Sequence, residues 1–188
     1  MENKILFINA SVRENSRTAE LSRHLLDSFD GKIEEVNLYR ENILPLDFKG
    51  LEKRNQHDYS GKEYDLARQF AAADTIVISA PFWDLSFPSM LKVYFENVTV
   101  SGITFEYSKE GRPMGKCKAK KLYYVTTSGG FIGGNNFGYE YIKALAESFF
   151  AIGETVFFSA EGLDIFGADV EAIMNDAKNK INEVMKND

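Results

Sequence analysis

The sequence predicts an α/β fold in which a parallel β-sheet is covered by helices on both faces. Five short segments are rich in apolar, aromatic and β-branched residues, and they lack the clean alternation of a sheet exposed on one side. Segments with apolar residues at helical spacing lie between and after them. Strands that alternate with helices in this way form parallel sheets, because parallel neighbours need a crossover connection.

The first predicted strand is Lys4–Asn9, and the helix after it covers residues 16–29, with Leu21, Leu25 and Leu26 on one face. The other four strands, in chain order, are 33–38, 75–80, Lys121–Thr127 and Glu154–Ala160. The other four helices are 60–72, 86–97, 138–150 and 169–185. Two connections, 39–60 and 98–120, are longer than this fold needs, which indicates a functional or interface role.

Five strands joined by right-handed crossovers favour the strand order 2-1-3-4-5, which is the flavodoxin-like order, with helices on both faces. The order reverses between strands one and three, and ligands bind there, outside the carboxyl ends of the strands. We therefore expect function in the loops after strands one, three and four. The length and the absence of a visible boundary predict one domain over residues 1–188.

The composition excludes several classes of protein. A net charge of −6 argues against a nucleic-acid binder, which needs a basic face. No apolar stretch is long enough to span a membrane, and the N-terminus lacks the features of a signal peptide, so we expect a cytoplasmic protein. His24 and His57 have no companions at metal-ligand spacing, so we expect no metal site. Cys117 is expected to be a bystander in a solvated loop, although its flanking lysines would also favour an acidified thiol.

The first loop, residues 9–18, is polar and leads directly into a predicted helix. A helix N-terminus offers unpaired backbone N–H groups and a partial positive charge, which suit an anion. Ser11, Ser16 and Thr18 add hydroxyl groups, and Arg17 adds a charge; a capped turn without a ligand is the alternative. The loop lacks the glycine patterns of dinucleotide and triphosphate sites, so a monophosphate held by hydroxyls and amides fits better.

The second loop, residues 80–89, is unusually apolar. Phe82, Trp83, Leu85 and Phe87 place much apolar surface in a segment that would otherwise face solvent. A planar, partly apolar ring lying on this loop would account for these side chains. The alternative is that they fold inward over the sheet.

The third loop, residues 126–138, holds five glycines within ten residues. Glycine lets a backbone approach a ligand closely, and Thr127 and Ser128 offer hydroxyl donors. Simple mobility of a glycine-rich loop is the alternative. Since all three loops follow the strands at which the fold predicts a crevice, we expect them to hold one ligand together.

Five segments carry a resemblance to a known family: Pro81-Phe82-Trp83-Asp84-Leu85, residues 91–97 and 102–107, Thr127-Ser128-Gly129-Gly130, and residues 160–162. They resemble the FMN-dependent NADH:quinone oxidoreductases and azoreductases of the flavodoxin-like superfamily, and the likeness covers nearly the whole chain. The resemblance implies FMN as a prosthetic group, with its phosphate on Ser11, Ser16, Arg17 and Thr18. It places the isoalloxazine ring against Phe82, Trp83, Asp84, Leu85, Thr127, Ser128, Gly129 and Gly130.

The resemblance also implies a homodimer in which each site is completed by the neighbouring subunit, with Tyr107 as the candidate catalytic residue near the flavin. Two residues depart from the family pattern. Arg17 stands where a neutral polar residue is common, and Asp84 stands where asparagine is frequent. A carboxylate at Asp84 would lower the flavin's reduction potential if it lay beside the ring; the alternative is that it turns outward.

The implied activity is hydride transfer from NADH or NADPH through flavin N5 to a quinone or an azo compound, by a ping-pong mechanism. The sequence leaves the preferred nicotinamide open. Three alternatives share the fold: a flavodoxin-type one-electron carrier, an NAD(P)H-dependent reductase that uses FMN as a substrate, and a binding protein without a cofactor.

Overall fold

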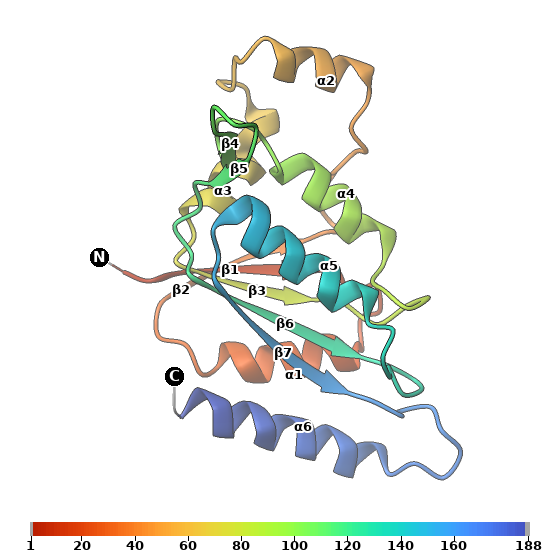
Figure 1. Ribbon diagram of the computed structural model, residues 1–188. Helices are drawn as coiled ribbons and strands as arrows, with labels where there is room; N and C mark the ends of the chain where they lie inside the picture. The colour runs from red at the N-terminus through yellow and green to blue at the C-terminus, as the bar shows by residue number, and fades with distance from the viewer. Residues whose placement is uncertain (1, 187–188) are drawn as a thin grey trace.

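The sheet has the predicted strand order. The computed structural model describes residues 2–186. Its five parallel strands run in the order β2-β1-β3-β6-β7 (Figure 1). They are β1 (Lys4–Asn9), β2 (Lys32–Asn37), β3 (Thr75–Ser79), β6 (Lys121–Thr127) and β7 (Glu154–Ala160). Numbered among themselves, these strands give 2-1-3-4-5, so the prediction of a flavodoxin-like sheet is confirmed.

Helices cover both faces of this sheet (Figure 1). One face carries α1 (Arg17–Leu26) and α6 (Val170–Met185). The other carries α3 (Asp65–Ala72), α4 (Ser89–Val98) and α5 (Phe137–Leu145). Among residues 2–186, no helix is both long enough and apolar enough to cross a membrane.

Strand β1 shows why the strands lack a clean alternation in the sequence. Ile5 and Phe7 belong to the core beneath α1 and α6, whereas Leu6 and Ile8 belong to the core on the opposite face. All four side chains are at most 2% exposed. Each burial of this kind stabilises the fold by about 1.5–3 kcal/mol, so both faces must be apolar.

Some helix boundaries differ from the predictions. The segment 60–72 is a 3₁₀ turn, η1 (Lys62–Tyr64), followed by α3. The helix predicted over 86–97 begins at Ser89, with Pro88 at its cap position, where a missing N–H costs nothing. The segment 138–150 ends its α-helical part at Leu145 and closes with a π-helical turn, η2 (Ala146–Phe150).

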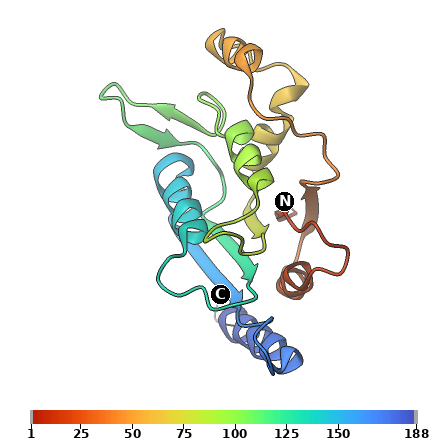
Figure 2. The ribbon, with the colours of Figure 1, turned by 90° about the vertical axis from the view of Figure 1, so that its right-hand side faces the viewer.

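The two long connections contain secondary structure that the sequence analysis did not predict. Residues 39–60 include α2 (Phe48–Asn55), none of whose residues is buried. Residues 98–120 include an antiparallel hairpin of β4 (Phe105–Tyr107) and β5 (Pro113–Gly115), which projects from the molecule in green in Figure 2. Gly115 packs against the backbone just before β7 begins. The hairpin therefore lies at the amino ends of the main strands, away from the loops expected to carry function (Figure 1).

Arg54 fastens helix α2 to the end of α4, and Lys53 of the same helix pairs with Glu63 at 2.7 Å. The Arg54 guanidinium donates hydrogen bonds to the carbonyls of Glu96 (2.8 Å), Asn97 (3.3 Å) and Thr99 (3.3 Å) at the end of α4. These carbonyls lack partners within α4, and a cation at a helix C-terminus is also favoured by the helix dipole. Arg54 therefore caps α4 from a distant segment.

The prediction that Cys117 lies in a solvated loop is wrong. Its side chain is buried with 4% exposed, and its Sγ–H donates to the carbonyl of Thr104 at 3.6 Å. Burial disfavours the thiolate and raises the pKa of Cys117 to about 12. The chain folds back over this residue after the hairpin, so the flanking lysines do not acidify the thiol.

Candidate functional site

A cavity of about 340 Å³ lies at the carboxyl ends of the strands. Its lining comes from four separate segments, residues 12–18 without Glu14, 81–83, 127–129 and 163–164. The first three are parts of the three loops that the sequence analysis singled out. The volume lies within the range of about 300–1,000 Å³ that is usual for small-molecule pockets.

The first loop presents the N-terminus of α1 to this cavity. Ser16 is the N-cap residue, and its hydroxyl accepts a hydrogen bond from the Ala19 amide at 3.2 Å. The Ser16 carbonyl accepts from the Glu20 amide, while the first amides of α1, at Arg17 and Thr18, have no partner inside the helix. Ser16 therefore fixes the position of amides that can bind an anion.

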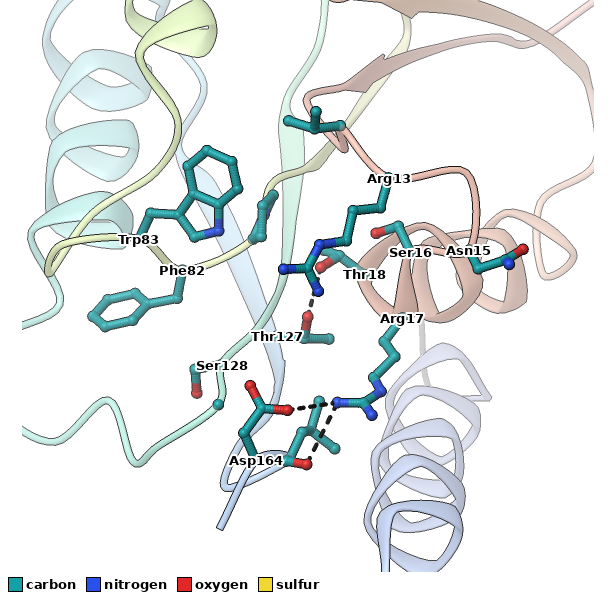
Figure 3. A pocket seen from close by; sticks show the side chains of 14 residues that line it. Arg13, Asn15, Ser16, Arg17, Thr18, Phe82, Trp83, Thr127, Ser128 and Asp164 are labelled. Carbon is teal, nitrogen blue, oxygen red and sulfur yellow. Dashed lines mark hydrogen bonds and ion pairs between the residues drawn. The ribbon is translucent and has the colours of Figure 1, made fainter.

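Two arginines add charge at the same place. Arg13 and Arg17 both line the cavity, and Figure 3 shows them on the side opposite Phe82 and Trp83. The Arg17 guanidinium pairs with the Asp164 carboxylate at 3.0 Å. The helix dipole, its unpaired amides and two guanidinium groups make this side of the cavity suitable for an anion.

The first and third loops are joined inside the cavity. Thr18 is buried, and its hydroxyl lies 2.6 Å from the hydroxyl of Thr127. Ser128 donates to the carbonyl of Gly130 at 2.6 Å. A Cβ atom on Gly129 would lie 2.5 Å from a carboxylate oxygen of Asp164, so glycine allows the third loop and residues 162–164 to lie against each other.

The second loop forms a strained turn. Trp83 and Ser86 exchange two backbone hydrogen bonds of 2.9 and 2.8 Å, and between them Asp84 and Leu85 have φ values of 50° and 66°. Two left-handed residues in succession make a two-residue hairpin turn that usually holds asparagine and glycine. The Phe137 amide donates to the Leu85 carbonyl at 3.1 Å and holds the turn. Strain of this kind on non-glycine residues gathers at ligand sites.

The turn divides the apolar side chains of the second loop. Phe82 and Trp83 line the cavity, and Trp83 keeps 44% of its surface exposed (Figure 3). Phe87 instead packs inward against Phe95 and Tyr141. Asp84 is exposed and is not part of the lining. The inward-folding alternative therefore holds for Phe87 alone of these aromatic residues.

The structure brings eight of the predicted site residues into the lining: Ser16, Arg17, Thr18, Phe82, Trp83, Thr127, Ser128 and Gly129. It places five others outside it: Ser11, Asp84, Leu85, Gly130 and Tyr107. Ser11 is buried with its hydroxyl 3.5 Å from that of Ser79. Tyr107 is 58% exposed on the hairpin, at the opposite end of the sheet from the cavity of its own chain.

Sequence reasoning did not name three polar residues of the lining: Arg13, Asn15 and Asp164. Arg13 and Asn15 lie within the polar loop 9–18, and the polar composition of that loop could have indicated them as site residues. Asp164 reaches the cavity because Leu163 and Asp164 donate backbone hydrogen bonds to Ser128 and Gly129. Nothing local in the sequence indicates these bonds, since they join segments that follow two different strands.

The residues present fit FMN. Guanidinium groups, hydroxyls and unpaired helix amides on one side suit a phosphomonoester, and the flat side chains of Phe82 and Trp83 suit a planar ring. Within residues 2–186, no group of three histidine, cysteine, aspartate or glutamate side chains is arranged to hold a metal ion.

Comparisons with known proteins identify the family of the chain. Residues 3–185 match a family described as having a flavodoxin-like fold. A protein of Lachnoclostridium phytofermentans named FMN-dependent NADH:quinone oxidoreductase is 34% identical over 196 residues, covering 97% of this chain and 98% of that one. A protein of Coprothermobacter proteolyticus with the same name is 33% identical over 201 residues, again with 97% and 98% covered.

Solved structures show the same fold. An azoreductase from Bacillus anthracis strain Sterne superposes with a TM-score of 0.84 at 21% identity, covering 99% of this chain and 100% of that one. An FMN-dependent NADH-azoreductase from Bacillus anthracis strain Ames Ancestor, solved in complex with FMN, gives a TM-score of 0.82 at 24% identity, with 98% of each chain covered. At these identities the likeness establishes the fold alone.

Proposed function

Because the chain belongs to the flavodoxin-like family that includes FMN-dependent NADH:quinone oxidoreductases, we propose that it is such an enzyme, with quinones or azo compounds as acceptors. The family match over residues 3–185 and the 34% identical relative confirm the family resemblance found in the sequence. The observation that carries the proposal is the single cavity in which a cationic helix end, an aromatic turn and a glycine-rich loop meet.

In this proposal the phosphate of FMN binds at the start of α1, to the amides there and to Ser16, Arg17 and Thr18, with Arg13 as an additional cation. The residues that would hold the ring are Phe82, Trp83, Thr127, Ser128 and Gly129. When bound, FMN would supply hydride transfer at N5 from NADH or NADPH to the acceptor, in the two half-reactions of a ping-pong mechanism.

The protein's own groups bind the phosphate, orient the ring and offer a surface to the acceptor. The two guanidinium groups lower the free energy of the bound phosphate, and Ser16 fixes the amides that receive it. The Ser128 amide donates to the Ala160 carbonyl at 3.0 Å and its hydroxyl to the Gly130 carbonyl at 2.6 Å, so the donors left for a polar ring edge are the backbone amides of Gly129 and Gly130. The exposed face of Trp83 gives a flat acceptor a surface on which to stack.

The proposal includes a homodimer, and this explains where Tyr107 would act. Tyr107 is exposed on the projecting hairpin and lies far from the cavity of its own chain (Figures 1 and 2). It can approach a flavin only if that flavin is bound by another subunit. Sedimentation of the purified protein tests this directly, because a monomer at micromolar concentration would exclude a role for Tyr107 near FMN.

The activity is tested by the visible spectrum and its response to nicotinamides. The purified protein is loaded with FMN, passed through gel filtration, and mixed with NADH or NADPH without oxygen. We expect flavin to be retained, its absorbance to bleach, and the colour to return when a quinone or an azo dye is added. Loss of the flavin on the column would favour a reductase that uses FMN as a substrate. Retained flavin that neither nicotinamide bleaches would favour a one-electron carrier. A protein that takes up no flavin would contradict the proposed function and favour a binding protein without a cofactor.

A further inference from the structure

We propose that Asp164 sets the affinity of the cavity for a phosphorylated ligand by competing with the ligand's phosphate for Arg17. This inference rests on the proposed function, because it takes the phosphate of FMN to bind at the N-terminus of α1. It adds to Arg17 a residue outside the FMN-binding loops named from the sequence, since Asp164 follows β7.

The contact itself is direct. The Nη1 atom of Arg17 donates to the Asp164 carboxylate at 3.0 Å and to the Leu163 carbonyl at 3.4 Å. Both charged side chains line the cavity, and Figure 3 shows the pair extending across it from the start of α1 to the segment after β7. The guanidinium group is thus turned toward an anion that the protein itself supplies.

The backbone of the segment that carries Asp164 is fixed against the third loop. The Asp164 amide donates to the Gly129 carbonyl at 2.9 Å, and the Leu163 amide donates to Ser128 at 3.1 Å. Gly162 donates to Gly130 at 3.1 Å, so three successive residues are tied to the third loop. The Arg17 and Asp164 side chains are 42% and 75% exposed, so neither is locked into the pair. The long Arg17 side chain begins at the N-terminus of α1 and can therefore turn toward an anion bound there.

The charges in the cavity make this exchange favourable. Of the described residues that line it, three carry charge: Arg13, Arg17 and Asp164. An exposed ion pair is weak, whereas a phosphomonoester carries a charge of about −1.5 to −2 and receives the helix amides as well. The phosphate can displace the carboxylate from Arg17, but part of its binding free energy is spent on breaking the pair. A ligand without a phosphate leaves the ion pair between Arg17 and Asp164 intact, so its affinity is not reduced in this way.

The test compares binding of FMN with binding of riboflavin, which lacks the phosphate. Flavin fluorescence is titrated against the full-length protein freed of flavin, as wild type, as Asp164→Asn and as Asp169→Asn. Asp169 is a matched control, because it caps α6 five residues further on, lies outside the lining, and asparagine caps a helix equally well. Thermal melting of each variant checks that the fold is intact.

We expect Asp164→Asn to bind FMN about two- to fivefold more tightly, the range that an exposed ion pair supports. Riboflavin affinity should stay unchanged, and Asp169→Asn should match wild type with both flavins. In an Arg17→Ala background, Asp164→Asn should no longer tighten FMN binding, because the competition acts through Arg17.

Three results would overturn the inference while leaving the proposed function intact. They are weaker or unaltered FMN binding by Asp164→Asn, an equal shift for riboflavin, and a tightening that persists in the Arg17→Ala background. Failure of the wild-type protein to bind FMN would refute the proposed function and this inference together.

Discussion

Replacing Arg17 by alanine tests the phosphate site most simply. Arg17 lines the cavity at the first position of α1, and its guanidinium is one of two cations there. Alanine is a good helix former and leaves the Ser16 cap and the helix amides in place. The change therefore removes one charged contact with the phosphate, together with the exposed ion pair to Asp164 and the hydrogen bond to the Leu163 carbonyl.

The magnitude follows from the exposure of Arg17. A hydrogen bond to a charged group contributes about 1.5–3 kcal/mol when it is well shielded. The Arg17 side chain is 42% exposed, so solvent screening lowers this contribution to about 1–1.5 kcal/mol. In the wild type, breaking the ion pair between Arg17 and Asp164 costs free energy and so reduces the net contribution of Arg17 to FMN binding. We therefore expect the Kd for FMN to rise about five- to tenfold.

The assay is fluorescence titration with FMN and riboflavin at low and high salt. Arg23→Ala is the matched control, because Arg23 is exposed in the last turn of the same helix and outside the cavity. The Kd for FMN should rise and depend less on salt in Arg17→Ala, whereas the Kd for riboflavin should not change. An FMN affinity equal to that of wild type in Arg17→Ala would refute the placement of the phosphate at α1.

Three further predictions concern stability and reactivity. Leu85→Gly should raise the free energy of unfolding, measured in urea, by about 0.5–1 kcal/mol. Glycine relieves the left-handed strain at φ 66°, and this gain exceeds the entropy that the more flexible unfolded chain gains. A loss of stability would show that the leucine side chain matters more than the strain. Arg54→Ala should lower the free energy of unfolding by about 1–2 kcal/mol, because three hydrogen bonds to the end of α4 are lost. The affinity for FMN should stay unchanged; an altered affinity would show that α2 influences the cavity. Cys117, whose pKa burial raises to about 12, should resist alkylation of the native protein at pH 8 and react once urea unfolds it. Between pH of about 8.5 and 12 the thiol ionises only in the unfolded chain. The contribution of Cys117 to stability is therefore complete below pH of about 8.5 and declines as the pH rises toward 12. Rapid alkylation of the native protein would contradict the burial of Cys117.

The order of the sheet could be predicted because each strand carries its own evidence. In β1, adjacent residues such as Ile5 and Leu6 are buried on opposite faces, and only a doubly covered sheet requires this. Parallel strands in that order bring the loops after β1, β3 and β6 to one edge. Sequence reasoning could therefore join Thr18 to Thr127 at the site, although 109 positions separate them.

The remaining features depend on contacts that leave no local pattern. Helix α2 buries none of its residues, so it has no apolar stripe to recognise. The strands of the hairpin are three residues long and include Pro113 and Gly115, which ordinarily indicate loops. Cys117 is buried only because residues 98–120 fold back on the body of the protein. Asp164 enters the cavity through backbone bonds to the third loop, which composition alone does not indicate.

The most direct test is a crystal structure of the protein grown with excess FMN. The account predicts electron density for the phosphate at the first amides of α1, within hydrogen-bond distance of Arg17, and for the ring between Trp83 and the Thr127–Gly129 backbone. Density for FMN elsewhere on the molecule, or a cavity that holds only solvent at saturating FMN, would contradict it.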